Sequence, residues 1–262
     1  MRSLVRFSLF VLVLSAVGAG LDAQGLPQFR PAVLASGAES LINRLDEKGL
    51  ASAGQKDGAV MFAVVVARTG EAKQFRTYRG MPGTAALEQE LRKKLENAKF
   101  APAIYNHQPV DVILAGTLVY SEATQPHLHL LLNQDPAEIK ADSDFIAPQP
   151  VFGADSAFTG LDYPTDIEVE VNAIVDLMLT VDAQGNPKQM TVVAEDPPLL
   201  GFAKVVAQDF DNAKFIPAFR DGDPVECTNT VYEVCYQPPD WKSPPFAQPL
   251  PETIPQVEPI EP

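Results

Sequence analysis

His127 and His129 are the residues whose type and spacing come nearest to a metal site. Two positions apart on a strand, they would project from the same face, as two zinc ligands do. The next acidic residues are Asp135 and Glu138, and neither stands at a spacing typical of a metal motif. Most such histidine pairs are surface residues. The sequence therefore predicts no metal here, with a metal-dependent hydrolase as the alternative.

Other motifs that carry chemistry are missing from the sequence. The chain has no Gly-x-Ser-x-Gly motif, no phosphate-binding glycine-rich loop and no dinucleotide fingerprint. Glu138, Asp142 and Asp144 lack the ordered spacing and glycine of a calcium loop. Asp209 and Asp211 are typical of a solvated helix end. We therefore expect no catalytic residue, no bound metal and no cofactor, and we do not expect an enzyme.

Cys227 and Cys235 are the only cysteines. They lie eight positions apart in a stretch, 225–236, whose composition predicts one strand. A straight strand would separate them by about 26 Å, whereas a disulfide requires Cα atoms within about 7 Å. We expect two separate, partly buried thiols; a bridge would need a turn at Asn229 and Thr230.

Composition excludes several classes of partner. The chain has 262 residues, a net charge of -14 and 46% hydrophobic residues. Nucleic-acid binders need a basic face, and no basic block occurs in this sequence. An anionic membrane surface is an equally poor partner. The hydrophobic content is sufficient for a packed core.

The first residues are typical of an export signal. Arg2 and Arg6 precede an apolar run at residues 7–19, and small residues favour cleavage after Ala19 or Ala23. The run is shorter than the roughly 20 residues that span a bilayer. We expect residues 1–23 to be a cleaved signal and the mature chain to be periplasmic; an uncleaved anchor is the alternative.

The rest of the chain overlays itself without gaps when it is shifted by 115 positions. The matches concentrate at turns and helix ends, where backbone geometry is most demanding, so two copies of one module are predicted. The matched positions include Gly70 with Gly185, Phe100 with Phe215, Pro102-Ala103 with Pro217-Ala218, and Pro109-Val110 with Pro224-Val225.

Each module is predicted to run strand, strand, helix, strand, within residues 58–120 and 163–236. The fold class is therefore α+β, with a helix on one face of each small antiparallel sheet. In the first copy Leu87, Leu91 and Leu95 form the apolar stripe of a helix at 85–98, with Thr84 as its N-cap. The predicted strands are 61–67, 74–78 and 110–120 in the first copy and 174–181, 189–193 and 225–236 in the second.

Three segments lie outside the modules. Residues 24–57 are expected to hold a short helix at 35–48. Residues 121–162 are expected to hold an extra strand at 127–132 and an extended linker around 147–150. The proline-rich, acidic tail 237–262 lacks a core-forming pattern and is expected to be disordered or polyproline-like.

Five elements of the second module, in this order, resemble the C-terminal domain of TonB-type energy transducers. They are Tyr163-Pro164, the strand 174–181, the turn Asp182-Ala183-Gln184-Gly185, Phe215-Ile216-Pro217-Ala218, and Gly222-Asp223-Pro224-Val225. The first module resembles a degenerate copy, with Ala67 where the aspartate of the turn should stand. The resemblance implies a periplasmic domain that adds a strand to a segment of an outer-membrane protein and has no catalytic residues.

The last strand of each module is therefore the predicted docking edge. The residues predicted to bind a partner strand are Val225, Val231, Tyr232, Val234 and Tyr236. The expected function is a TonB-C-like protein-binding module that engages an envelope protein, with a link to TonB-type transport and a possible homodimer. The alternative is a structural envelope protein whose last strands pair with each other or with the strand at 127–132.

Overall fold

The computed structural model describes residues 25–153, 156, 158, 161, 163–164, 167, 170–210 and 213–238. The predicted signal and nearly all of the predicted tail lie outside these residues. Within the described part of the chain, no helix is long and apolar enough to cross a membrane. The fold is mixed α and β, with several small antiparallel sheets and a few short helices, which confirms the predicted class.

The larger sheet has four antiparallel strands in the order β4-β3-β8-β9. They are β3 (Gly58–Val66), β4 (Ala72–Tyr78), β8 (Val112–Tyr120) and β9 (Leu128–Leu131). β3 pairs along its whole length with β8. β9 pairs with the other side of β8, which confirms the extra strand predicted after the first module. The outer edge of β8 is therefore covered, as the structural alternative expected.

Helix α3 (Ala85–Leu95) covers one face of this sheet. Its apolar side chains recur every four residues, so Leu87, Leu91 and Leu95 face the core together and are fully buried. Thr84 occupies the predicted N-cap position. Its hydroxyl donates to the Met81 carbonyl oxygen (2.6 Å), however, and makes no capping bond to the first turn.

The second sheet has three antiparallel strands in the order β12-β11-β16. They are β11 (Ala173–Val181), β12 (Pro187–Asp196) and β16 (Cys227–Tyr236). Alternate residues of β11 are buried, and helix α5 (Phe202–Phe210) packs Phe202, Val206 and Phe210 on the second core. Glu195 in β12 accepts from the Phe202 N–H (2.9 Å), which fixes the first turn of α5 against the sheet.

Both predicted last strands are present, but each begins two residues later than predicted. The first is β8, because Val110 ends a separate strand, β7 (Gln108–Val110), and the second is β16, because Val225 ends β15 (Asp223–Val225). β7 pairs in a hairpin with β6 (Ala103–Tyr105), and β15 pairs with β14 (Ala218–Arg220). β7 does not continue into β8 because the two strands pair in different sheets, and the same is true of β15 and β16.

The segment predicted as a linker is packed. β10 (Gln149–Pro150) pairs with β13 (Phe215–Ile216), and the buried Gln149 amide exchanges two hydrogen bonds with the backbone of Ala32 (2.7 and 2.8 Å). The remaining short strands are β1 (Phe29–Arg30), β2 (Val33–Leu34) and β5 (Phe100–Ala101). β1 pairs with β6 and β2 with β5, so the segment before the first sheet is also tied to the fold.

The single helix predicted at 35–48 is divided. The structure has a 3-10 turn η1 (Gly37–Glu39), α1 (Leu41–Arg44) and α2 (Glu47–Ser52). The break falls at Asp46, whose carboxylate accepts from the Gly49 N–H (2.9 Å) and starts α2 as its N-cap. One further helix, α4 (Pro136–Ala141), follows β9.

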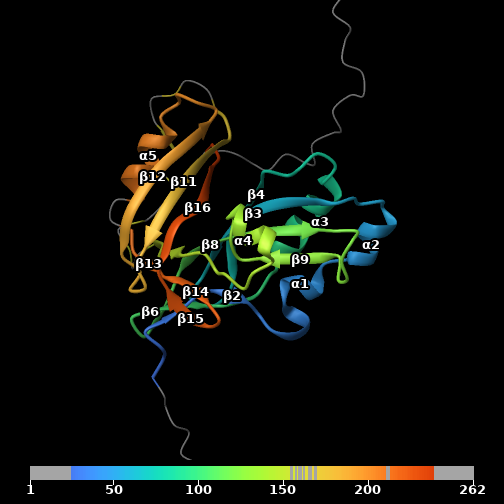
Figure 1. Ribbon diagram of the computed structural model, residues 1–262, viewed down its shortest axis with the longest axis horizontal. Helices are drawn as coiled ribbons and strands as arrows, with labels where there is room; N and C mark the ends of the chain where they lie inside the picture. Colours follow the sequence, from blue (N-terminus) through green and yellow to red (C-terminus); the bar gives the residue numbers. More distant parts are fainter. Residues whose placement is uncertain are drawn as a thin grey trace, which may run out of the picture.

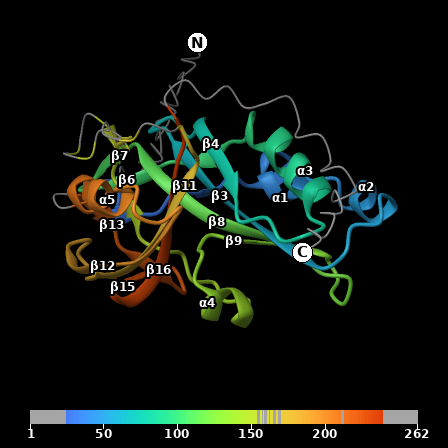
Figure 2. The same cartoon turned by 90° about the horizontal axis from the view of Figure 1, so that it is seen from above.

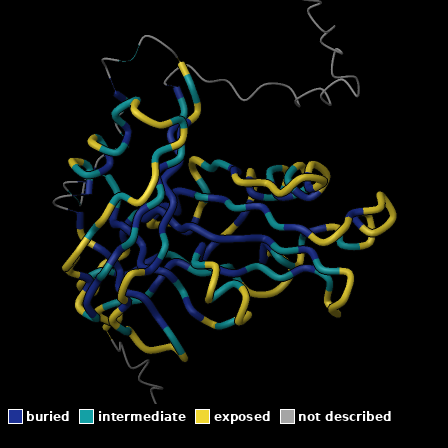
Figure 3. The backbone as a smooth tube through the Cα atoms, turned by 45° about the horizontal axis from the view of Figure 1, so that its top comes forward, coloured by how far each residue is buried: buried dark blue, intermediate teal, exposed yellow. Residues whose placement is uncertain are grey.

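The two sheets have separate cores that share residues at their boundary. Val65 and Ile113 of the larger sheet belong to the core under α5, and Ile216 and Phe219 belong to the core under α3. Figure 1 shows the second sheet with α5 on one side of the molecule and the larger sheet crossing its centre. Figure 2 shows α5 at one end of the molecule and α2 at the other, with α3 between α2 and the strands of the larger sheet. Buried residues run through both sheets, and exposed residues are frequent in the loops (Figure 3) and along β12.

Candidate functional site

The predicted docking strand, β16, lies at an edge of its sheet. The predicted partner-binding residues do not, however, form one exposed surface. Tyr232, Val234 and Tyr236 are buried in the core under α5. Val231 is half-buried, and Val225 lies in the separate strand β15, where it pairs with Ala218. A partner strand at this edge would therefore bind the backbone N–H and carbonyl groups of β16 rather than these side chains.

The outer edge of β16 is already hydrogen-bonded. The Val231 N–H donates to Asp135 Oδ2 (3.2 Å), and the Glu233 N–H donates to Gln134 Oε1 (3.0 Å). On the acceptor side, Tyr78 Oη donates to the Glu233 carbonyl oxygen (3.3 Å), and Arg76 Nη1 donates to the Cys235 carbonyl oxygen (2.7 Å). These side chains occupy the places that a partner strand would take. Pairing at β16 would require their displacement.

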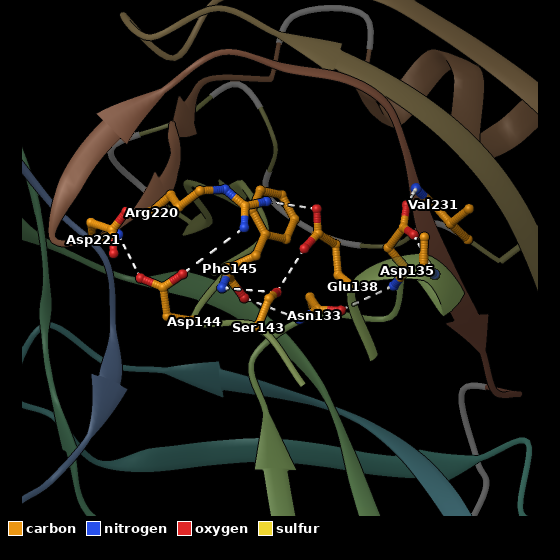
Figure 4. Close-up of polar contacts among 10 residues, drawn as sticks. Asn133, Asp135, Glu138, Ser143, Asp144, Phe145, Arg220, Asp221 and Val231 are labelled. Carbon is orange, nitrogen blue, oxygen red and sulfur yellow. Dashed lines mark hydrogen bonds and ion pairs between the residues drawn. The ribbon is translucent and has the colours of Figure 1, made fainter. Parts of the chain in front are cut away.

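Hydrogen bonds fix the loop that carries Asp135 to the hairpin of β14 and β15 (Figure 4). Glu138 of α4 receives hydrogen bonds from Arg220 Nη2 and Ser143 Oγ, both at 2.6 Å. The Arg220 guanidinium also lies over the Phe145 ring, 5.1 Å from its centroid. Because Arg220 ends β14, this network anchors α4 to the second half of the chain and holds Asp135 against β16.

A charged cluster joins the same two parts of the molecule. Arg79 donates to Glu233 Oε2 (2.8 Å) and to Asp176 Oδ1 (2.7 Å). The Glu233 side chain is only 8% exposed. Burial raises its pKa above the ordinary value, although the Arg79 guanidinium opposes this shift. The Asp176 charge adds to the increase in pKa.

Glu233→Gln is expected to remove part of the pH dependence of stability. A carboxyl group whose folded pKa is raised stabilises the fold fully below the ordinary glutamate pKa of about 4.3. That contribution is lost as the pH rises through the raised value. Over this interval the wild-type protein loses this contribution as the pH rises, and the variant does not. The free energy of unfolding of the variant minus that of wild type should therefore increase with pH. Urea denaturation of both proteins at several pH values across the interval measures this difference in free energy of unfolding. A difference that stays constant or falls as the pH rises contradicts the prediction.

The histidine pair is occupied by local contacts. His127 Nδ1 lies 2.9 Å from the Ser121 carbonyl oxygen, and His129 Nε2 lies 3.0 Å from Thr124 Oγ1. His129 Nδ1 also lies 3.3 Å from Asp142 Oδ2. Among the residues that the structure describes, no three histidine, cysteine or acidic side chains form a group able to hold a metal ion.

The two cysteines are free and buried, as expected for separate thiols. Both lie in β16, and the turn considered at Asn229 is instead an irregularity of the strand, where Asn229 has a φ of 54°. Burial raises the pKa of the Cys235 thiol to about 11. This thiol is therefore protonated near neutral pH and is a poor nucleophile.

The opposite edge of the sheet, β12, differs from β16. β12 is ten residues long and largely exposed, and Val193 is 58% exposed. It pairs with β11 on one side, and no described residue hydrogen-bonds to its other side. A register shift near Val193 interrupts the ladder with β11, which is one way that edge strands limit unwanted pairing. β12 is the longest edge that the described residues leave uncovered.

Comparisons of this chain with protein-family models, with curated proteins and with solved structures find no match. The residues that carry the TonB-like resemblance are therefore considered by their own geometry. Tyr163 exchanges two hydrogen bonds with the backbone of Val171 (2.8 and 2.9 Å) before β11. Asp182 Oδ1 accepts from the N–H groups of Gln184 and Asn186 (3.0 and 2.8 Å) and so shapes the turn after β11.

Sequence reasoning missed the residues that cover β16. The residues concerned stand in no motif and at no regular spacing: Gln134, Asp135, Tyr78 and Arg76. The first two lie between the predicted strand at 127–132 and the predicted linker around 147–150. Gln134 is a polar side chain that is only 1% exposed. A buried amide normally has specific partners, but the sequence alone does not show that it is buried.

Proposed function

We propose that this chain is an exported, TonB-C-like protein-binding module that engages an extended segment of an envelope protein by strand pairing at β12. The observation that supports it most is the ten-residue edge of β12, whose outer side has no partner among the described residues. In this proposal the five motif elements form the second sheet, in the order β12-β11-β16. The docking edge is β12, at the side of the sheet opposite to β16. The two modules descend from one repeated unit, and a link to TonB-type transport is part of the proposal.

The pairing register identifies which groups of β12 would bind the partner. The β16 residues whose N–H groups face outward, Val231 and Glu233, alternate with those that face β11. Leu179 lies opposite Thr230 on one side and Met190 on the other. Because backbone groups alternate along a strand, Leu179 bonds to β16, and Met190 directs its N–H and carbonyl away from β11. Met190 is therefore a docking position.

Met190→Pro is the test of this proposal, with Met190→Ala as its matched control. Both variants lose the packing of the methionine side chain, but only proline removes the outward N–H. The partner is first captured from detergent-solubilised envelope with the chain from residue 24 onward, and a synthetic peptide of its bound segment is then titrated by fluorescence anisotropy. We expect the alanine variant to bind within a few-fold of wild type and the proline variant to lose more than tenfold in affinity.

The outcome that contradicts the proposal is equal binding by Met190→Pro and Met190→Ala when circular dichroism shows both to be folded. A second copy of this chain is a further candidate occupant of the edge. Sedimentation of the chain alone, at several concentrations, distinguishes a homodimer from a module that needs a different partner.

A specific observation also favours the alternative of a structural envelope protein. The outer edge of β16 is used internally, through Gln134, Asp135, Tyr78 and Arg76. In this alternative no envelope segment protects β12. Hydrogen exchange measured with and without envelope extract separates the two, because only the strand-binding proposal expects slower exchange of the Met190 amide.

A further inference from the structure

Two irregularities divide the exposed edge strand β12. Its pairing with β11 is regular over residues 189–192. Lys188 and Val193, on either side of this stretch, have no opposite residue in β11, so a bulge bounds the stretch at both ends. A bulge disrupts the ladder and turns the strand locally. Of the ten residues of β12, the central four therefore form the regular part of the edge.

The flanks of this stretch do not lengthen the regular edge. Pro187, the first residue of β12, has no N–H group to offer a partner. At the other end, the Glu195 carboxylate accepts from the N–H groups of Leu200 and Phe202 (3.0 and 2.9 Å). These bonds hold the chain in the loop that leads into α5. A partner strand therefore finds a short regular edge with fixed limits.

Within the regular stretch, Met190 and Val192 direct their backbone groups away from β11. Met190 does so because Leu179, which lies opposite it, bonds to β16. Val192 lies two positions further along the same stretch and therefore has the same direction. A partner strand would place one residue directly opposite each of them. Residues directly opposite each other project from the same face of a sheet.

The side chains of Met190 and Val192 are apolar and half-buried, and they pack against the core under α5. Thr191, between them, is exposed and projects from the other face of the sheet. Water therefore still reaches part of the two apolar side chains at the open edge. Apolar residues placed opposite them would remove this surface from water, whereas the residue between would stay in solvent.

We propose that the β12 edge recognises a short segment of its envelope partner with the pattern apolar-polar-apolar, whose two apolar side chains lie opposite Met190 and Val192. This inference rests on the proposed function, because it names the chemistry of the partner at the same edge. The two bulges limit the register, and burial of the two apolar side chains selects the segment. A threonine in the middle position would lie beside Thr191, a favourable cross-strand pair.

Two synthetic peptides of equal composition test this pattern. One is Ser-Thr-Val-Thr-Val-Thr-Ser, and the other, Ser-Thr-Thr-Val-Val-Thr-Ser, has adjacent valines. Adjacent side chains face opposite sides of a strand, so only one valine of the second peptide can lie on the α5 side. Each peptide is titrated by NMR into the ¹⁵N-labelled chain from residue 24 onward. We expect the alternating peptide to bind about fivefold more tightly, because it buries one more valine.

Val192→Thr tests whether this side chain selects the peptide. Threonine keeps the shape of valine but adds a hydroxyl, so the preference for the alternating peptide should fall to about twofold or less. Val119→Thr is the matched control, because Val119 is a half-buried strand residue of the larger sheet, and the preference should stay unchanged. Circular dichroism checks both folds. If Val192→Thr does not fold, the comparison of the two peptides on the wild-type protein remains the test.

Met190→Pro separates this inference from the proposed function. If the two peptides bind wild type equally and Met190→Pro loses both, β12 is the docking edge and the pattern is wrong. If both peptides still bind a folded Met190→Pro variant, they bind elsewhere, and the edge and the pattern both fail. If neither peptide shifts the amide signals of β12 in wild type, the pattern is overturned, and titration of the captured partner's own segment still tests the proposed function.

Discussion

Replacing Gln134 with leucine is expected to lower the free energy of unfolding by about 3 kcal/mol. The Gln134 amide joins two parts of the molecule that are far apart in sequence. Its Oε1 accepts from the Glu233 N–H (3.0 Å), and its Nε2 donates to Tyr78 Oη. Leucine has a similar volume but neither polar atom. The variant would leave two buried groups without these partners, at a cost of roughly 1–3 kcal/mol each.

Urea denaturation of the Gln134→Leu variant measures this loss. Gln89→Leu is the matched control, because Gln89 is an exposed residue of α3 and the same chemical change there should alter stability by less than about 0.5 kcal/mol. Equal stability of the two variants would show that Gln134 does not support the edge of β16.

The same substitution has a functional consequence. Without Gln134, the Glu233 N–H becomes available at an edge of the second sheet, next to Val231. An uncovered edge is a template for pairing with another chain. Gln134→Leu should therefore increase concentration-dependent association in sedimentation experiments, whereas Gln89→Leu should not.

Gly185→Ala is expected to destabilise the protein by about 3 kcal/mol. Gly185 has a φ of 79°, which is unfavourable for residues with a side chain, and a Cβ atom there would lie 2.0 Å from the Phe215 carbonyl oxygen. The close approach is a consequence of the fold, because the Phe215 N–H donates to the Gly185 carbonyl oxygen (3.2 Å). Relief of the contact would move the end of β11 away from β13.

Gly222→Ala separates the two causes of this loss. Gly222 also has a positive φ, 86°, but a Cβ atom there would meet nothing within 4 Å. Its replacement should cost only about 1 kcal/mol, the strain of the left-handed conformation. Chemical denaturation of both variants gives the difference, and equal losses would show that the contact with Phe215 is unimportant.

The same device occurs at the matched position of the first half. Gly70 has a φ of 83°, and a Cβ atom there would lie 2.2 Å from the Phe100 carbonyl oxygen. Gly70 and Gly185 are a pair that the sequence overlay aligns, as are Phe100 and Phe215. This shared geometry supports the proposal of a repeated unit and gives a physical reason for glycine at both positions.

Much of the local structure could be predicted because local patterns determine it. The leucine spacing of α3, the apolar strand β11 and the strand after residue 127 all appear in the structure near their predicted places. The prediction was wrong only at the first residues of the two last strands. β8 and β16 begin two residues after the predicted starts at 110 and 225, because Val110 and Val225 pair in other sheets, and the apolar pattern gives no sign of this break.

The candidate site could be predicted only in part. An edge strand as the docking element follows from the module, and β16 is an edge. Its cover could not be predicted, since Gln134 and Glu233 are 99 positions apart and Tyr78 and Glu233 are 155 positions apart. No periodicity connects such residues. That β12 is the edge left uncovered also depends on the packing of distant residues, which no sequence pattern shows.

The sequence by itself determined the α+β class, the apolar face of α3, the strand β11 and the glycine turns, because each depends on residues close together in the chain. The tertiary structure alone decided which edge of the second sheet is covered. This depends on how the two sheets pack. That packing brings distant side chains together through shape and hydrogen bonding, which leave no regular pattern along the chain.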